Sequence, residues 1–88
     1  MRLASGNITA NDTAAPLADA GVLTSRVILQ NNGSVSVRVG SSDSQDLVVV
    51  AEGDYTIETP NGSTFDLSTV YVVTDSDEAL VGWNAMIG

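Results

Sequence analysis

The chain has 88 residues, enough for one small domain, and its 11 acidic residues against three arginines give a net charge of −8. That charge repels phosphate backbones and anionic lipids, which argues against nucleic acids and membranes as partners. The sequence contains no cysteine, histidine or lysine, so it excludes disulfides, thiolate metal ligands and the usual catalytic bases.

The first residues hold no apolar run of the length that a signal peptide needs, and no later segment is long enough for a membrane helix. We therefore expect a protein that is made in a cytoplasm and is used there or assembled there into something larger. A chain this short buries only about 60% of its unfolded surface, so oligomerisation or docking is a common source of added stability.

Residues 1–21 are expected to form a short strand near Leu3 to Thr9, followed by an irregular arm that belongs to the same domain. The arm has room for one helical turn, but Pro16 prevents a longer helix. The core of a β-sandwich is expected over residues 22–88.

Residues 22–31 predict a strand with Val27 and Leu29 on one face, because apolar side chains alternate there with polar ones. The Asn-Asn-Gly segment at 31–33 predicts a tight hairpin, since Asn and Gly accept the positive φ angles that such a turn needs. Residues 34–40 predict the second strand of that hairpin, with its valines facing inward.

The apolar run from Leu47 to Ala51 is typical of a strand that is covered on both faces. The expected cover is either a second sheet or a neighbouring subunit. Further strands are expected at 55–58 and 69–74, with a turn at 60–63 between them.

The last strand is expected at 79–87, where every second residue is apolar. Trp83 lies on the apolar face, so we interpret it as a core residue rather than as a sugar platform or an interface anchor. Leu80 and Met86 lie on the opposite face, which suggests that a partner covers it. About seven or eight short strands are typical of a small antiparallel β-sandwich or a jelly-roll-like barrel, and this all-β class is our prediction.

No nucleophile or acid is paired with a base in a recognisable arrangement, so we expect no enzymatic activity and no cofactor. Asp75, Asp77 and Glu78 are weak candidates for calcium ligands, because carboxylate oxygens bind Ca²⁺. The glycine and the spacing of an EF-hand loop are missing there. A solvated acidic turn without a metal is therefore the favoured interpretation.

A family resemblance is carried by segments that hold most of the expected strands. They are Arg26-Val27-Ile28-Leu29-Gln30-Asn31-Asn32-Gly33 with Val35-Ser36-Val37-Arg38-Val39-Gly40, then Glu52-Gly53-Asp54-Tyr55-Thr56-Ile57, and Phe65-Asp66-Leu67-Ser68-Thr69-Val70-Tyr71-Val72-Val73. Over residues 22–87 the chain resembles small β-sandwich proteins from the particles of tailed bacteriophages. The resemblance implies a decoration or cement protein of the virion, assembled in the host cytoplasm. Such a protein binds the major capsid protein on the capsid exterior, often as a homotrimer.

A protein of this kind needs a docking surface, and we expect that surface on the N-terminal arm and on the outward face of the last strand. The candidate interface residues are Arg2, Leu3, Ile8, Leu17, Leu80 and Met86. The arm would add a strand to a capsid subunit through main-chain hydrogen bonds. Two other functions stay open. One is a tail, collar or fibre component of the virion, and the other is a calcium-assisted carbohydrate-binding β-sandwich that uses Trp83 and the acidic turn.

Overall fold

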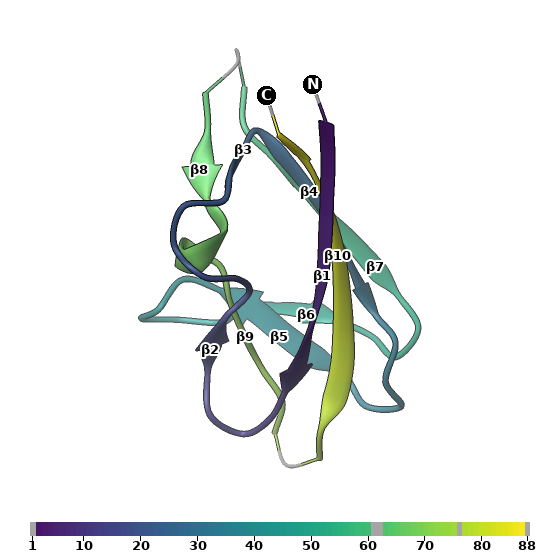
Figure 1. Cartoon of the computed structure of the whole chain (residues 1–88). Coiled ribbons are helices and arrows are strands. Elements are labelled where there is room, and N and C mark those ends of the chain that lie inside the picture. Colours follow the sequence, from purple (N-terminus) through teal and green to yellow (C-terminus); the bar gives the residue numbers. More distant parts are fainter. Residues whose placement is uncertain (1, 61–62, 76, 88) are drawn as a thin grey trace.

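The computed structural model describes residues 2–60, 63–75 and 77–87 of the chain. These residues form an all-β fold, as predicted (Figure 1). The strands are β1 (Arg2–Ala10), β2 (Ala15–Pro16), β3 (Leu23–Thr24), β4 (Arg26–Asn31), β5 (Val37–Gly40), β6 (Leu47–Val49), β7 (Asp54–Glu58), β8 (Phe65–Asp66), β9 (Tyr71–Val73) and β10 (Ala79–Ile87). The helix that the described residues contain, η1 (Leu67–Thr69), is a single 3-10 turn, and no helix there is long and apolar enough to cross a bilayer.

The strands pair in a nested order that identifies the topology. β1 pairs with β10, β2 with β9, β3 with β8, β4 with β7, and β5 with β6, always antiparallel. The chain is thus one long two-stranded ribbon that doubles back between β5 and β6. Pairing of β10 with β4 and of β5 with β9 rolls this ribbon up. The result is the jelly roll, which places two four-stranded sheets face to face.

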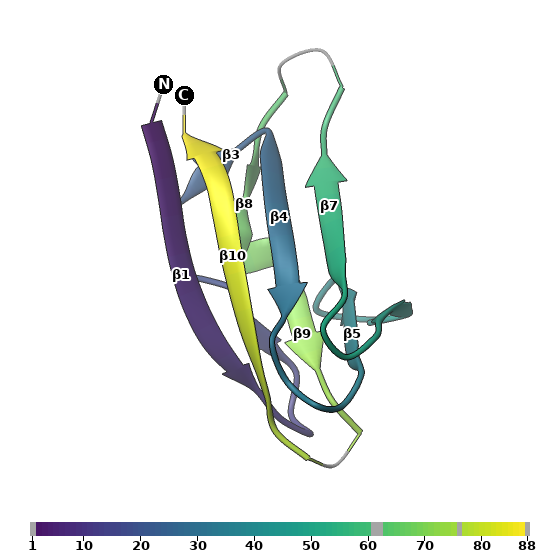
Figure 2. The ribbon, with the colours of Figure 1, turned by 90° about the vertical axis from the view of Figure 1, so that its right-hand side faces the viewer.

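The two sheets form the layers of the molecule (Figure 2). Sheet A has the strand order β1-β10-β4-β7, and sheet B has the order β2-β9-β5-β6. Their inner faces enclose a core of small and β-branched side chains, because alternate residues of each strand point inward. In β10 the inward residues are those expected from the sequence, and Trp83 is only 8% exposed. The interpretation of Trp83 as a core residue is therefore confirmed.

The N-terminal stretch is integrated into the sandwich and does not form a free arm. β1 pairs with β10 along its whole length. Leu17 is buried, and its N–H donates a hydrogen bond of 2.7 Å to Val70 O. The segment that could have made a helical turn instead contains β2, which pairs with β9. The strand expected near Leu3 to Thr9 is confirmed as β1. The irregular segment after it packs on the sandwich, where Leu17 is buried, so it is not an exposed arm that could add a strand to a capsid subunit.

The predicted hairpin at 31–33 is also wrong, since the chain crosses there from sheet A to sheet B. β4 pairs with β10 and β7, whereas β5 pairs with β6 and β9. Gly33 does not have a positive φ. It is required for a different reason, because a side-chain carbon at this position would lie 2.5 Å from Ala79 Cβ.

The buried Asn31 side chain holds this crossover in place. Its Nδ2 donates to Val35 O at 2.8 Å and to Val49 O at 3.1 Å, and its Oδ1 accepts from Gly33 N at 3.0 Å. The Asn-Asn-Gly segment therefore does not form a hairpin turn; through the Asn31 side chain it links the two sheets.

Candidate functional site

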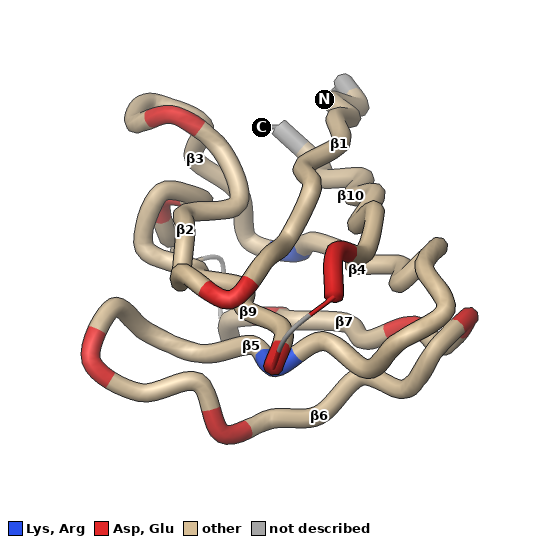
Figure 3. Tube along the Cα trace, turned by 90° about the horizontal axis from the view of Figure 1, so that it is seen from below, with Lys and Arg blue, Asp and Glu red and all other residues tan. Residues whose placement is uncertain are grey.

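On the outer face of sheet A the acidic side chains lie at one margin, on the edge strand β7, which carries Asp54 and Glu58. β1, β10 and β4 contain no aspartate or glutamate, although the chain has 11 acidic residues. Figure 3 shows the acidic positions on the loops and on the short or peripheral strands instead. The four strands of sheet B also contain no acidic residue, so low electrostatic repulsion is shared by both sheets and does not single out this face.

The register of sheet A determines which side chains meet on this face. Directly opposite residues of an antiparallel pair point to the same side, so each pair adds one row to the surface. The outward pairs are Leu3 with Met86, Ser5 with Asn84, Asn7 with Gly82, Thr9 with Leu80, Gly82 with Gln30, Asn84 with Ile28, Arg26 with Glu58, Ile28 with Thr56, and Gln30 with Asp54. Apolar side chains lie at the ends of the face and amide side chains lie between them.

An apolar hollow of about 230 Å³ lies at the end of the face that carries Leu3. Leu3, Ile28 and Met86 line it together with Arg26, and Leu3 is 74% exposed. The Arg26 Nε atom lies 3.9 Å from Glu58 Oε2 in an exposed ion pair, which contributes little to stability. The hollow has the size and the lining to receive one apolar side chain of a partner.

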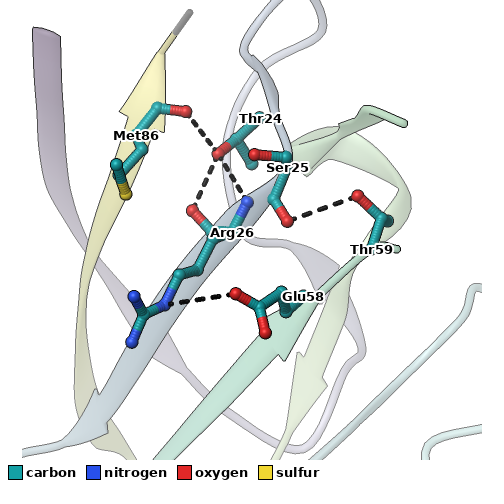
Figure 4. A network of polar contacts seen from close by, with 6 residues as sticks. All are labelled: Thr24, Ser25, Arg26, Glu58, Thr59 and Met86. Carbon is teal, nitrogen blue, oxygen red and sulfur yellow. Dashed lines mark hydrogen bonds and ion pairs between the residues drawn. The ribbon is translucent and has the colours of Figure 1, made fainter. Parts of the chain in front are cut away.

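Hydrogen bonds between the Thr24 side chain and main-chain atoms hold the strands beside this hollow (Figure 4). The buried Thr24 hydroxyl lies 2.6 Å from Met86 O and 2.7 Å from Arg26 O, and it accepts a hydrogen bond from Arg26 N at 3.0 Å. This hydroxyl therefore ties the end of β10 to the beginning of β4. The main-chain atoms of Met86 and Arg26, whose side chains line the hollow, are thus joined through one buried residue.

A second hollow, of about 440 Å³, occupies the middle of the face and is lined mainly by amides. Gly82 forms its floor, and a side-chain carbon there would lie 3.2 Å from Asn32 Nδ2 and 3.4 Å from Asn7 Oδ1. Gln30 and Asn84 complete the amide lining. Amide groups both donate and accept hydrogen bonds, so they suit peptide groups or hydroxyl groups, and Asp54 adds one carboxylate to the lining.

The structure places the six predicted interface residues in three different settings. Leu3 and Leu80 are exposed on the outer face, and Met86 is half-buried beside Leu3. Ile8 is half-buried and packs against the core, and Leu17 is buried, so neither lies on an exposed arm. The side chain of Arg2 lies outside the described residues.

The acidic turn does not assemble a metal site in the described part of the chain, where no three potential ligands cluster. Asp75 instead forms an ion pair with Arg38, with 2.9 Å between Oδ1 and Nη2. Asp77 and Glu78 are exposed.

Sequence reasoning missed the amide hollow and overestimated the cover of the run at 47–51. The amides come from three strands and one loop, and the pattern of no single segment marks them as a group. In the run, Val49 is buried, but Leu47 is 47% exposed and Val48 is 61% exposed. Sheet B packs on sheet A through one face, so among the described residues no second sheet covers the other face of β6, and cover by a neighbouring subunit stays a prediction.

Comparisons with known proteins assign no family to the chain. No family model and no curated protein matches it. A solution NMR structure of a de novo designed double-stranded β-helix is similar over 97% of both chains, with 11% sequence identity and a TM-score of 0.47. The fold assignment rests on the strand pairing of the chain itself.

Proposed function

We propose that the chain is a structural protein that decorates and stabilises a bacteriophage capsid by binding major capsid protein subunits. The observation that carries the proposal is the outer face of sheet A, which joins an apolar hollow to a hollow lined by four amide side chains and Asp54. The family resemblance of residues 22–87 adds the virion as the setting.

The two hollows have the composition that is typical of protein–protein interfaces. Such interfaces combine apolar anchors in pockets with hydrogen-bonding groups around them. Leu3, Ile28 and Met86 supply the apolar part, and the amides of Asn7 and Gln30 supply donors and acceptors. None of these groups is a nucleophile or titrates near neutral pH, so the proposal assigns neither catalysis nor a cofactor to the site.

Two matched charge insertions test the docking surface. Leu3→Glu places a carboxylate in the apolar hollow, and Val48→Glu places the same charge on β6, where the side chain is 61% exposed. Binding to shells assembled from the major capsid protein is measured by co-sedimentation. We expect Leu3→Glu to weaken binding by about tenfold or more, and Val48→Glu to weaken it by less than about threefold. The reverse ranking would move the docking surface to sheet B.

The oligomeric state is a separate part of the proposal. The family resemblance implies a trimer, and light scattering of the purified protein measures the mass in solution directly. If the protein is a monomer at all concentrations, the free protein does not form a trimer, and any trimer would have to assemble on the capsid surface.

Two alternatives remain. A tail, collar or fibre component would dock by the same chemistry but in few copies for each particle. A carbohydrate-binding module is favoured by the amide hollow, although the burial of Trp83 removes the stacking platform first assigned to it. NMR titration with a neutral oligosaccharide such as maltotriose, with Gln30→Ala as the control variant, tests the second alternative. Shifts confined to this hollow and lost in the variant would support it.

A further inference from the structure

β1 is a long edge strand without the protection that edge strands usually have. It pairs on one side with β10, and no described strand lies on its other side (Figure 2). Residues 3–10 contain no charge and no proline, which are the common means of blocking an edge. The other edge strands of sheets A and B are protected against pairing with another chain. β7 carries the charges of Asp54 and Glu58, β6 is only three residues long, and β2 has two residues that include Pro16.

A slot of about 420 Å³ runs alongside this open edge, between β1 and the segment 16–22. Ile8, Leu17, Val22 and Trp83 line it. Gly6 makes room for the indole ring, since a side-chain carbon at position 6 would lie 2.8 Å from Trp83. The slot therefore offers a mostly apolar receptacle directly beside unpaired main-chain groups.

Asp19 is the charged residue among those that line the slot. A carboxylate at the rim of an apolar slot favours a ligand that carries a positive charge beside its apolar group. A second copy of this chain brings a net charge of −8 and an edge strand that is uncharged over residues 3–10. Electrostatics therefore favours a different protein as the occupant.

We propose that β1 receives an extended segment of the partner protein by strand addition. The segment pairs with the free edge of β1, places a bulky apolar side chain in the slot, and carries a basic residue near Asp19. Main-chain hydrogen bonds supply affinity in this mode, and pockets for alternate side chains supply specificity. This inference rests on the proposed docking function and identifies how the partner engages the chain.

The test uses two blocked synthetic peptides of about nine residues, the length of an added strand opposite β1. Both alternate Thr with Val and have a central Leu, and one has a Lys at each end where the other has a Glu. Binding to the full chain is followed by NMR through amide exchange and chemical shifts, and by the emission of Trp83. We expect the Lys peptide to bind at least about fivefold more tightly than the Glu peptide and to slow amide exchange along β1.

Charge reversal at Asp19 has a matched control. Asp19→Lys and Asp43→Lys change the net charge equally at exposed positions, but only the residue at position 19 lines the slot. Asp19→Lys is expected to reverse the peptide preference, and Asp43→Lys is expected to preserve it. An unchanged preference in Asp19→Lys, protection confined to β6 or β7, or β1 protection that grows with protein concentration alone would overturn the inference.

Failure of this inference is distinguishable from failure of the docking function. The peptide assay contains no capsid protein. If the peptides do not bind β1 while Leu3→Glu still abolishes attachment to shells, strand addition is wrong and docking through the outer face stands. If the wild-type chain does not attach to shells at all, the docking function is wrong.

Discussion

Asn31 connects three segments of the chain that are distant in sequence or belong to different sheets. Its side chain is 1% exposed and bonds to the main chain near Gly33, at Val35 and at Val49. A buried amide with several partners is more costly to remove than a surface amide, because each abandoned carbonyl loses its hydrogen bond without regaining water.

Asn31→Ala is expected to lower the free energy of unfolding by about 2–3 kcal/mol, a large share of the stability of a small domain. The matched control is Asn32→Ala, which removes an exposed amide from the adjacent position and is expected to change stability by less than about 0.5 kcal/mol. Urea denaturation measures both. Equal effects of the two substitutions would contradict the role of Asn31 as a link between the two sheets.

Asp66 links the segment before β3 to η1. Its Oδ1 accepts a hydrogen bond from Ser68 N and its Oδ2 accepts one from Gly21 N, each at 2.9 Å. These bonds, that of Ser68 first, hold the pKa of the Asp66 carboxyl below its ordinary value of 3.8. A lowered pKa means that the ionised form stabilises the folded state above pH 3.8, and that this contribution is lost as pH falls through the folded pKa.

Asp66→Asn is therefore expected to be less stable than the wild type at about pH 7, with a gap that narrows toward about pH 3 as the wild type loses its carboxylate. Asp43→Asn removes the same charge from an exposed loop and controls for net charge. Urea denaturation at the two pH values measures the gap. A gap that is constant or widens in acid would contradict the assignment.

At the scale of elements, β1 is a structural strand of sheet A. Deletion of residues 1–13 removes β1, one of the two strands that pair with β10, and uncovers the core beside Trp83. We expect the shortened chain to lose the dispersed NMR spectrum of a folded protein, and addition of the 1–13 peptide to restore it. A shortened chain that stays folded would contradict this role and reinstate the free arm.

Several strands could be predicted because their signal is local. The alternation in β4, β5 and β10 reports which side chains are buried, and the structure places Val27, Leu29, Val37 and Val39 in the core accordingly. The Asn-Asn-Gly segment was misread because a hairpin and a crossover between sheets require the same small, polar residues. The nested strand pairing is non-local and has no signature in any one segment.

The candidate site was predictable only in part for the same reason. Leu80 and Met86 were assigned to the outward face of their strand from alternation alone. The meeting of Met86 with Leu3 and Ile28 depends on the register of three strands, which no segment of the sequence specifies, whereas Leu80 lies at the opposite end of the face beside Thr9. Ile8 and Leu17 were chosen as apolar residues of a presumed arm, and they became half-buried and buried once that segment joined the sandwich.

On the scale of the whole molecule, 11 acidic residues against three arginines make the surface strongly negative. A net charge of −8 on 88 residues opposes the compact state through self-repulsion, which salt screens. We expect the melting temperature to rise by several degrees between about 10 mM and about 500 mM NaCl.

The double variant Asp12→Asn and Asp43→Asn removes two of the exposed acids and is the control for screening. Its melting temperature should rise less with salt than that of the wild type, because less repulsion remains to be screened. A melting temperature that is unchanged or falls with salt would contradict the electrostatic account of this surface.

Docking on a large assembly is the central claim, and quantitative mass spectrometry of purified particles of the virus that encodes the chain tests it most directly. The account predicts a copy number comparable to that of the major capsid protein, because a decoration protein occupies repeated sites on the shell. Absence of the chain from the particles would contradict it.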